Sequence, residues 1–227
     1  MDMRITNTSL PGVVIIEPEA FQDHRGFFFE SYNKKRFAEH GLLHTFVQDN
    51  HSRSSCGVLR GLHYQDGTAP QHRLVRCTLG AVWDVVVDLR VGSPTFGTWF
   101  GLSLSAENKK QLLIAPEFAH GFVVLSDVAE VQYKCTNYHN ANAEACLAWD
   151  DPDVAIAWPV PNPTLSDRDR TQGATLRQYV QQPAFLFADK DAPAGHQDIS
   201  RELAIPSGAY HHQAFHERRK ASSSRRK

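Results

Sequence analysis

A single histidine stands within a strand-like run at residues 57–65, GVLRGLHYQ. Side chains of a strand alternate between its two faces. Strict alternation places Leu59, Gly61, His63 and Gln65 on one face, and Arg60, Leu62 and Tyr64 on the other. An imidazole held on a rigid strand suits proton transfer, because its pKa lies near neutral pH. For His63 taken alone, a hydrogen-bonded core histidine is the simpler interpretation.

Two residues far along the chain could complete an acid–base site. Asp169, in the run LSDRD at 165–169, could orient the imidazole of His63 and stabilise its charged form. Tyr133 shares a strand face with Val131 and Cys135, so its hydroxyl is expected to point inward. Taken alone, each has a simpler interpretation: a solvated turn carboxylate for Asp169 and a core aromatic for Tyr133.

Other kinds of chemistry lack their sequence patterns. His120 stands alone at 116–122, the chain has no HxH pair, and its four cysteines form no CxxC pair, so no converging metal-ligand set is visible. A GxSxG elbow, a Walker loop and a GxGxxG loop are also missing from the sequence. Acid–base chemistry without a cofactor is the candidate left among these kinds of chemistry.

Short strands must position these residues. Apolar and polar residues alternate at 83–90, 100–105 and 131–136, and glycines and prolines separate such runs. This pattern predicts an all-β sandwich or barrel. A short helix is expected at 34–40, with Asn33 as its N-cap and Gly41 just past its end, and a second near 106–110.

Composition bounds the domain organisation and the compartment. With 227 residues, 41% of them hydrophobic, the chain can form one domain at 1–184, followed by an extension at 185–227 where the pattern weakens. Six basic residues lie within 218–227, which we interpret as a disordered end. The sequence shows neither a signal peptide nor an apolar run of the roughly 20 residues needed to span a bilayer. We expect a cytoplasmic protein with no nucleic-acid or membrane partner.

An ordered set of segments resembles the dTDP-4-dehydrorhamnose 3,5-epimerase family, the RmlC-type sugar-nucleotide epimerases. The set covers roughly residues 3–182. Its segments are 23–30 (DHRGFFFE), 48–50 (QDN), 58–65, 74–76, 84–97, 105–108, 116–121, 133–136 (YKCT), 149–152 (WDDP) and 165–169. Each segment alone is weak, and their order is what makes the resemblance specific.

The resemblance implies a cupin-type jelly-roll barrel with a few short helices, no cofactor or metal, and a homodimer. It implies a nucleotide-linked 4-keto-6-deoxy-hexose as substrate, inverted at C3, C5 or both through an enolate. By the family pattern His63 is the base, Asp169 its partner and Tyr133 the acid on the opposite face. Substrate contacts would come from Arg25, Glu30, Gln48, Asn50, Arg60, His120, Glu144 and Arg168.

Two departures from the family pattern concern the substrate. The family usually has Gly-Lys where this chain has His72-Arg73. Arg73 keeps the cation, and with Arg60 it could stabilise an enolate or bind phosphate. The family's stacking tyrosine at the thymine base is replaced by His139, whose ring offers less area. Three functions stay open: the 3,5-epimerase, a mono-epimerase for another nucleotide sugar, and a non-catalytic sugar-nucleotide-binding jelly roll.

Overall fold

The computed structural model of the protein describes residues 2–188, which form thirteen strands and three short helices. The helices are α1 (Lys34–Glu39), α2 (Asp167–Thr171) and α3 (Leu176–Tyr179). The strands are β1 (Met3–Asn7), β2 (Val13–Pro18), β3 (Phe21–Asp23), β4 (Gly26–Phe28), β5 (Gln48–Ser55), β6 (Leu59–Gln65), β7 (Arg73–Leu79), β8 (Ala81–Asp88), β9 (Trp99–Ser105), β10 (Gln111–Ile114), β11 (Phe118–Val124), β12 (Val128–Cys135) and β13 (Glu144–Cys146).

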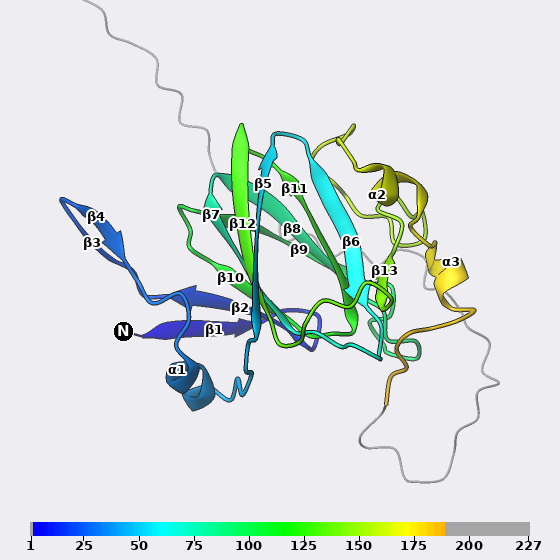
Figure 1. Ribbon diagram of the computed structural model, residues 1–227, viewed down its shortest axis with the longest axis horizontal. Coiled ribbons are helices and arrows are strands. Elements are labelled where there is room, and N and C mark those ends of the chain that lie inside the picture. The colour runs from blue at the N-terminus through cyan, green and yellow to red at the C-terminus, as the bar shows by residue number, and fades with distance from the viewer. Residues whose placement is uncertain (1, 189–227) are drawn as a thin grey trace, which may run out of the picture.

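Two antiparallel sheets pack face to face (Figure 1). One has the order β1-β2-β10-β7-β12-β5 and the other β13-β6-β11-β8-β9. Buried apolar side chains from both sheets fill the space between them, among them Val75, Val86, Leu112 and Val131. Long-range strand crossovers of this kind are typical of jelly rolls. The prediction of an all-β jelly roll with a few short helices is confirmed.

The sheet of β6 and β8 is buried on both faces, not on one. Val82 and Val86 belong to the core between the sheets, whereas Val85 and Val87 pack in a second cluster with Leu147 and Leu176. The segment after β13, which contains α2 and α3, covers this outer face (Figure 1). The alternating side chains at 83–90 therefore point into two different apolar clusters, one on each face of the sheet.

The first predicted helix is confirmed and the second is wrong. Asn33 caps α1, and its side-chain oxygen accepts from the backbone N–H groups of Lys35 (3.1 Å) and Arg36 (3.3 Å). Residues 106–110 form a turn instead. There Ser105 and Asn108 exchange side-chain-to-backbone hydrogen bonds of 3.0 and 3.1 Å. Such bonds compete with the hydrogen bonds of a helix. Lys109 has a φ of 54°, which is incompatible with a right-handed helix.

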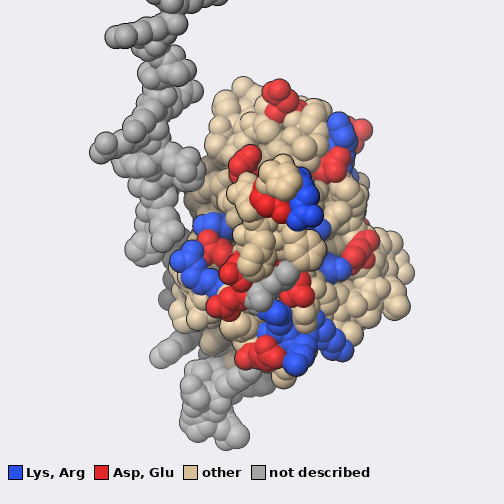
Figure 2. Space-filling model, turned by 90° about the vertical axis from the view of Figure 1, so that its left-hand side faces the viewer, with Lys and Arg blue, Asp and Glu red and all other residues tan. Residues whose placement is uncertain are grey.

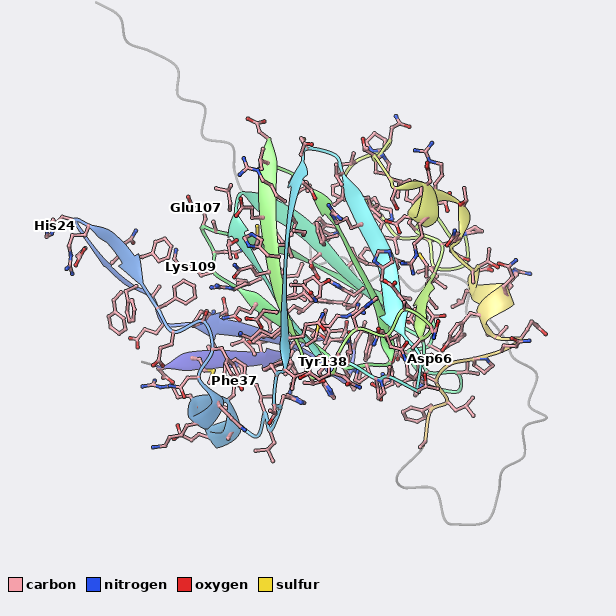
Figure 3. All side chains as sticks on the ribbon, viewed as in Figure 1. His24, Phe37, Asp66, Glu107, Lys109 and Tyr138 are labelled. Atoms are coloured by element: carbon pink, nitrogen blue, oxygen red, sulfur yellow. The ribbon has the colours of Figure 1, made fainter. Side chains whose placement is uncertain are left out.

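The hairpin β3–β4 projects from the rest of the fold (Figure 1). His24 lies at its tip, far from the two sheets (Figure 3). Every residue from 21 to 28 is exposed, including Phe21, Phe27 and Phe28. The hairpin therefore presents large apolar side chains that no other described part of the chain covers.

The face of the molecule from which the hairpin projects carries charges of both signs. Lysine and arginine lie among aspartate and glutamate on the face seen in Figure 2. Within residues 2–188, no helix is long and apolar enough to cross a membrane. The predicted extension at 185–227 lies outside the described residues from 189 on. Its first residue, Phe185, is buried against Tyr64 and Tyr179.

Candidate active site

A cavity of about 300 Å³ receives side chains from both sheets. This volume is at the lower end of the range for small-molecule sites. Most of the predicted site residues line it: Gln48, Asn50, Arg60, His63, Arg73, His120, Tyr133, His139 and Glu144. The lining also includes residues that sequence reasoning missed: Ser52, Gln65, Gln71, Gly121 and Phe122. Ser52 and Gln65 could have been found, since each lies two residues along a strand from a predicted lining residue.

His63 and Asp169 form a hydrogen-bonded pair. His63 Nε2 lies 2.6 Å from Asp169 Oδ1, so Nδ1 is the ring nitrogen left to accept a proton. Asp169 is in the first turn of α2, and its backbone N–H donates to the capping Ser166 hydroxyl at 3.1 Å. Burial raises the pKa of the Asp169 carboxyl, but the hydrogen bond and charge of His63 outweigh it, and the pKa lies below its ordinary value.

An extra residue in β6 changes which side chains share a face. His63 pairs with His120 on β11, whereas Arg60 pairs with Phe122. Between these two pairs, β6 contains one residue more than β11. Such a bulge reverses the alternation of side chains. Arg60 and His63 consequently line the same cavity, and the prediction that they lie on opposite faces is wrong.

Two glycines allow the strands to meet at this bulge. A Cβ atom on Gly61 would lie 2.6 Å from the Cα atom of Gly121, and one on Gly121 would lie 2.7 Å from the Arg60 carbonyl oxygen. Gly61 also has a φ of +132°, which other residues rarely adopt. Only glycine fits at both positions, so these residues fix the path of β6 beside His63.

Tyr133 enters the cavity from β12, in the sheet opposite His63. Burial raises the pKa of its hydroxyl, while the nearby cations Arg73 and Arg60 counteract this shift. The hydroxyl therefore stays protonated at neutral pH and can act as a proton donor. Its place opposite His63 suits a reaction that removes a proton from one side of a carbon and returns it to the other.

Two arginines bring positive charge to the cavity. Arg73 Nη1 donates to the backbone carbonyl of His63 at 2.9 Å, and Arg60 Nε donates to the Ser54 hydroxyl at 2.9 Å. Burial lowers the pKa of Arg73, which nonetheless remains charged because a guanidinium titrates so high. Among residues 2–188 neither arginine forms an ion pair with a carboxylate. Both charges are thus free to bind an anion.

His120 is held by a fully buried carboxylate. Its Nε2 lies 3.0 Å from both oxygens of Asp84, which comes from the neighbouring strand β8. Burial raises the pKa of Asp84, and the charge and hydrogen bond of His120 act against this. The pair fixes the orientation of the His120 ring at the cavity wall.

Polar residues at the edge of the cavity form a connected group. Arg168 Nη1 donates to Glu144 Oε2 at 2.6 Å, and His139 Nε2 lies 3.3 Å from the same oxygen. The backbone N–H of His139 donates to Gln48 Oε1, and the amide of Gln48 donates to Asn50 Oδ1. Burial raises the pKa of Glu144, but Arg168 and His139 more than offset it, so the carboxyl has a lowered pKa.

Three predicted binding residues do not line the cavity. Arg168 reaches it only through its hydrogen bond to Glu144, whereas Arg25 and Glu30 lie elsewhere. Arg25 lies on the projecting hairpin, where its guanidinium pairs with Asp23. Glu30 pairs with Arg36 of α1 at 3.0 Å, beside a separate small hollow. Neither contacts the cavity of its own chain.

Known proteins are similar to this chain in sequence. The sequence profile described as dTDP-4-dehydrorhamnose 3,5-epimerase matches residues 7–177. The chain belongs to this family. A family member from Pseudomonas aeruginosa is 56% identical over 170 residues, covering 74% of this chain and 93% of its own. A member from Shigella flexneri is 55% identical over 168 residues, covering 74% and 93%. The resemblance seen in the sequence, and with it the isomerase class, is confirmed.

Solved structures of the family superimpose on this fold. The dTDP-6-deoxy-D-glucose-3,5-epimerase RmlC from Legionella pneumophila, in complex with dTDP-4-keto-L-rhamnose, has a TM-score of 0.78 at 46% identity. It covers 82% of this chain and all of its own. The 3'-monoepimerase ChmJ from Streptomyces bikiniensis, in complex with dTDP-quinovose, has a TM-score of 0.72 at 34% identity, covering 77% and 88%. The family thus contains enzymes that differ in the number of centres they invert.

Proposed function

We propose that this chain converts a dTDP-linked 4-keto-6-deoxy-glucose to dTDP-4-dehydrorhamnose, inverting C3 and C5 by acid–base catalysis in deoxysugar biosynthesis. The observation that carries this proposal is the placement of His63 and Tyr133 on opposite sheets around one cavity. Support also comes from the high identity to 3,5-epimerases along the whole matched region.

The proposed reaction moves one proton at each inverted carbon. The C4 ketone acidifies the hydrogen on the neighbouring carbon, and His63 Nδ1 accepts that proton while the electron pair moves onto the C4 oxygen. Asp169 stabilises the resulting imidazolium. Arg73 and Arg60 are the cations able to stabilise the enolate oxygen or the diphosphate. Tyr133 then donates its hydroxyl proton to the opposite face of the carbon, and both groups regain their protonation states from solvent.

A mono-epimerase is the second candidate. ChmJ, which is 34% identical to this chain, is a 3'-monoepimerase, so the same fold supports inversion of one centre. His63 and Tyr133 would serve either reaction. His139 at the cavity edge replaces the tyrosine that the family uses to stack on thymine. The second candidate is therefore a mono-epimerase whose substrate carries a nucleotide other than dTDP.

The test counts exchanged hydrogens. The protein is incubated in heavy water with dTDP- and CDP-linked 4-keto-6-deoxy-glucose, and mass spectrometry follows the sugar. Two exchanged and inverted carbons are expected, and His63→Ala should lower the rate about 10²–10⁴-fold while remaining folded. One exchanged carbon would establish the mono-epimerase. Binding without any exchange would refute both and identify a sugar-nucleotide-binding protein.

We propose further that the protein is a homodimer in which the hairpin of one copy completes the cavity of the other. Arg25 matches a family binding position, yet it lies outside its own cavity on the hairpin β3–β4. The exposed Phe21, Phe27 and Phe28 on that hairpin supply an apolar surface suited to a second copy. Arg25 would then reach the partner's substrate.

Mixing two inactive variants tests this arrangement. Arg25→Ala disables a hairpin and His63→Ala disables a cavity. In a mixed dimer one site has both native parts, so random exchange of subunits should restore up to about a quarter of wild-type activity. Absence of recovery, with mixed dimers shown to form, would contradict the shared site.

We also propose a cytoplasmic location. All four cysteines are free thiols, and three of them, Cys77, Cys135 and Cys146, are buried. Free thiols are usual in a reducing compartment. Cell fractionation with an antibody to the chain would test the location.

A further inference from the structure

Three different metal-ligand atoms converge beside the cavity. A ring nitrogen of His63, the thiol sulfur of Cys146 and a carboxylate oxygen of Asp169 lie within 4.8 Å of one another. They come from β6, β13 and α2. The expectation that no ligand set converges is wrong here, because residues so far apart in the chain match no ligand spacing.

The fold holds these donors in place. Cys146 is the direct cross-strand partner of His63 between β13 and β6. Residues paired in this way have Cβ atoms only about 5 Å apart. Asp169 is bonded to His63 Nε2 at 2.6 Å, and Asp169 and Cys146 are both at most 5% exposed. The fold therefore keeps the three donors near one another.

The donor set suits zinc. Thiolate, imidazole and carboxylate are the ligands of Zn²⁺, whereas Ca²⁺ and Mg²⁺ prefer oxygen atoms alone. Zinc bonds of about 2.0–2.3 Å require ligand atoms roughly 3.3–3.8 Å apart. Donor atoms up to 4.8 Å apart must approach, and His63 Nε2 and Asp169 Oδ1, which are 2.6 Å apart, must separate. Both changes require shifts of about 1 Å or less.

We propose that His63, Cys146 and Asp169 form an inhibitory Zn²⁺ site. The ion binds between His63 Nε2 and Asp169, so the ring proton that Nε2 shared with Asp169 moves to Nδ1. Cys146 binds as the thiolate, and only its thiol proton passes to solvent. With zinc on Nε2, the proton of the neutral ring stays on Nδ1, and that nitrogen can no longer accept one from a substrate. The loss of activity rests on the proposed function, whereas zinc binding does not.

Binding is tested on the full chain with Co²⁺ as a coloured substitute for Zn²⁺. A thiolate-to-cobalt absorption band is expected, and Zn²⁺ should abolish it by competition. Cys146→Ser should lose the band, while Cys56→Ser, which changes the exposed thiol, should keep it. Asp169→Asn should weaken Zn²⁺ binding by more than about 10-fold, since even groups that support metal ligands contribute that much. A missing band, a band that depends on Cys56, or unchanged affinity in Asp169→Asn would overturn the site.

Inhibition is tested separately. Zn²⁺ at about ten times its Kd should lower epimerisation about 10-fold by mass action, and a chelator should restore it. Cys146→Ser should keep its activity and lose this sensitivity. An equally sensitive Cys146→Ser variant would refute inhibition at this site. A protein inactive on every 4-keto sugar would refute the proposed function, while the Co²⁺ titration would still decide the metal site.

Discussion

Tyr133 and His63 line one cavity from two different sheets. Tyr133 belongs to β12, which pairs with β5 and β7, whereas His63 belongs to β6, which pairs with β11 and β13. The two side chains are thus held by separate hydrogen-bonded frameworks. A ring bound between the sheets would present one face to each of them.

Tyr133→Phe is expected to separate proton removal from inversion. His63 is intact in this variant, so deuterium should still enter the substrate from heavy water. The return of a proton to the opposite face should fail because the hydroxyl is missing, and the label should return to the original face. NMR and mass spectrometry would measure inversion and exchange in one sample. Equal loss of both rates would contradict separate roles for the two residues.

Asp169→Asn is expected to lower turnover about 10²–10⁴-fold without preventing nucleotide-sugar binding. The amide can still hydrogen-bond to His63, but it carries no charge to stabilise the imidazolium. The matched control is Asp153→Asn, which removes a carboxylate that pairs with Arg177 at the surface. Turnover and calorimetric binding are measured for both. Unchanged turnover in Asp169→Asn would leave Asp169 with only a structural role.

His139→Tyr is expected to tighten dTDP-sugar binding if thymine is the natural base. His139 is exposed at the edge of the cavity, so a larger ring can be accommodated. An added stacking energy of about 0.5–1.5 kcal/mol corresponds to roughly a 2- to 10-fold gain in affinity. Competition among dTDP, UDP, CDP and GDP measures the preference. A protein that prefers dTDP and yet does not respond to the substitution would show that His139 does not face the base.

His72→Gln is expected to flatten the pH dependence of stability. Burial, with a smaller contribution from the charge of His44, lowers the pKa of His72 to about 4 from an ordinary 6.5. Between these values the unfolded chain binds a proton that the folded protein does not. The free energy of unfolding therefore rises with pH between about 4 and 6.5, by less than about 3 kcal/mol because solvent reaches part of the ring. Above this window the destabilisation by His72 is absent.

Denaturant unfolding between pH 4 and 7, at one protein concentration, measures the slope. The variant should show a smaller rise than wild type, and the lowered pKa of His44 should account for part of the rise that remains. His40→Gln, at an exposed position after α1, should show the wild-type rise. An identical slope in wild type and His72→Gln would show that other groups cause the dependence.

The sequence predicted best those elements that depend on residues near one another in the chain. Asn33 predicts the start of α1 because an N-cap acts within its own turn. The period-two runs predict the sheets for the same reason. The turn at 106–110 was missed because two side-chain bonds, from Ser105 and Asn108, outweigh helix propensity.

Other features depend on contacts that sequence patterns do not contain. The bulge in β6 is visible only from its pairing with β11, so the face of Arg60 was mispredicted. The distance of Arg25 from its own cavity follows from the projection of a whole hairpin. The neighbourhood of Cys146 and His63 follows from the pairing of β13 with β6, which joins segments far apart in the chain.

The extra residue of β6 has an evolutionary consequence. Arg60 and His63 share a face because of how many residues lie between them, and Gly61 and Gly121 only allow that spacing. A substitution in this stretch changes one side chain, but a one-residue deletion would rotate every side chain on one side of it away from the cavity. Deletions within residues 60–63 are therefore expected to be tolerated less well than substitutions. Activity measured across a deletion scan and a substitution scan of β6 would test this.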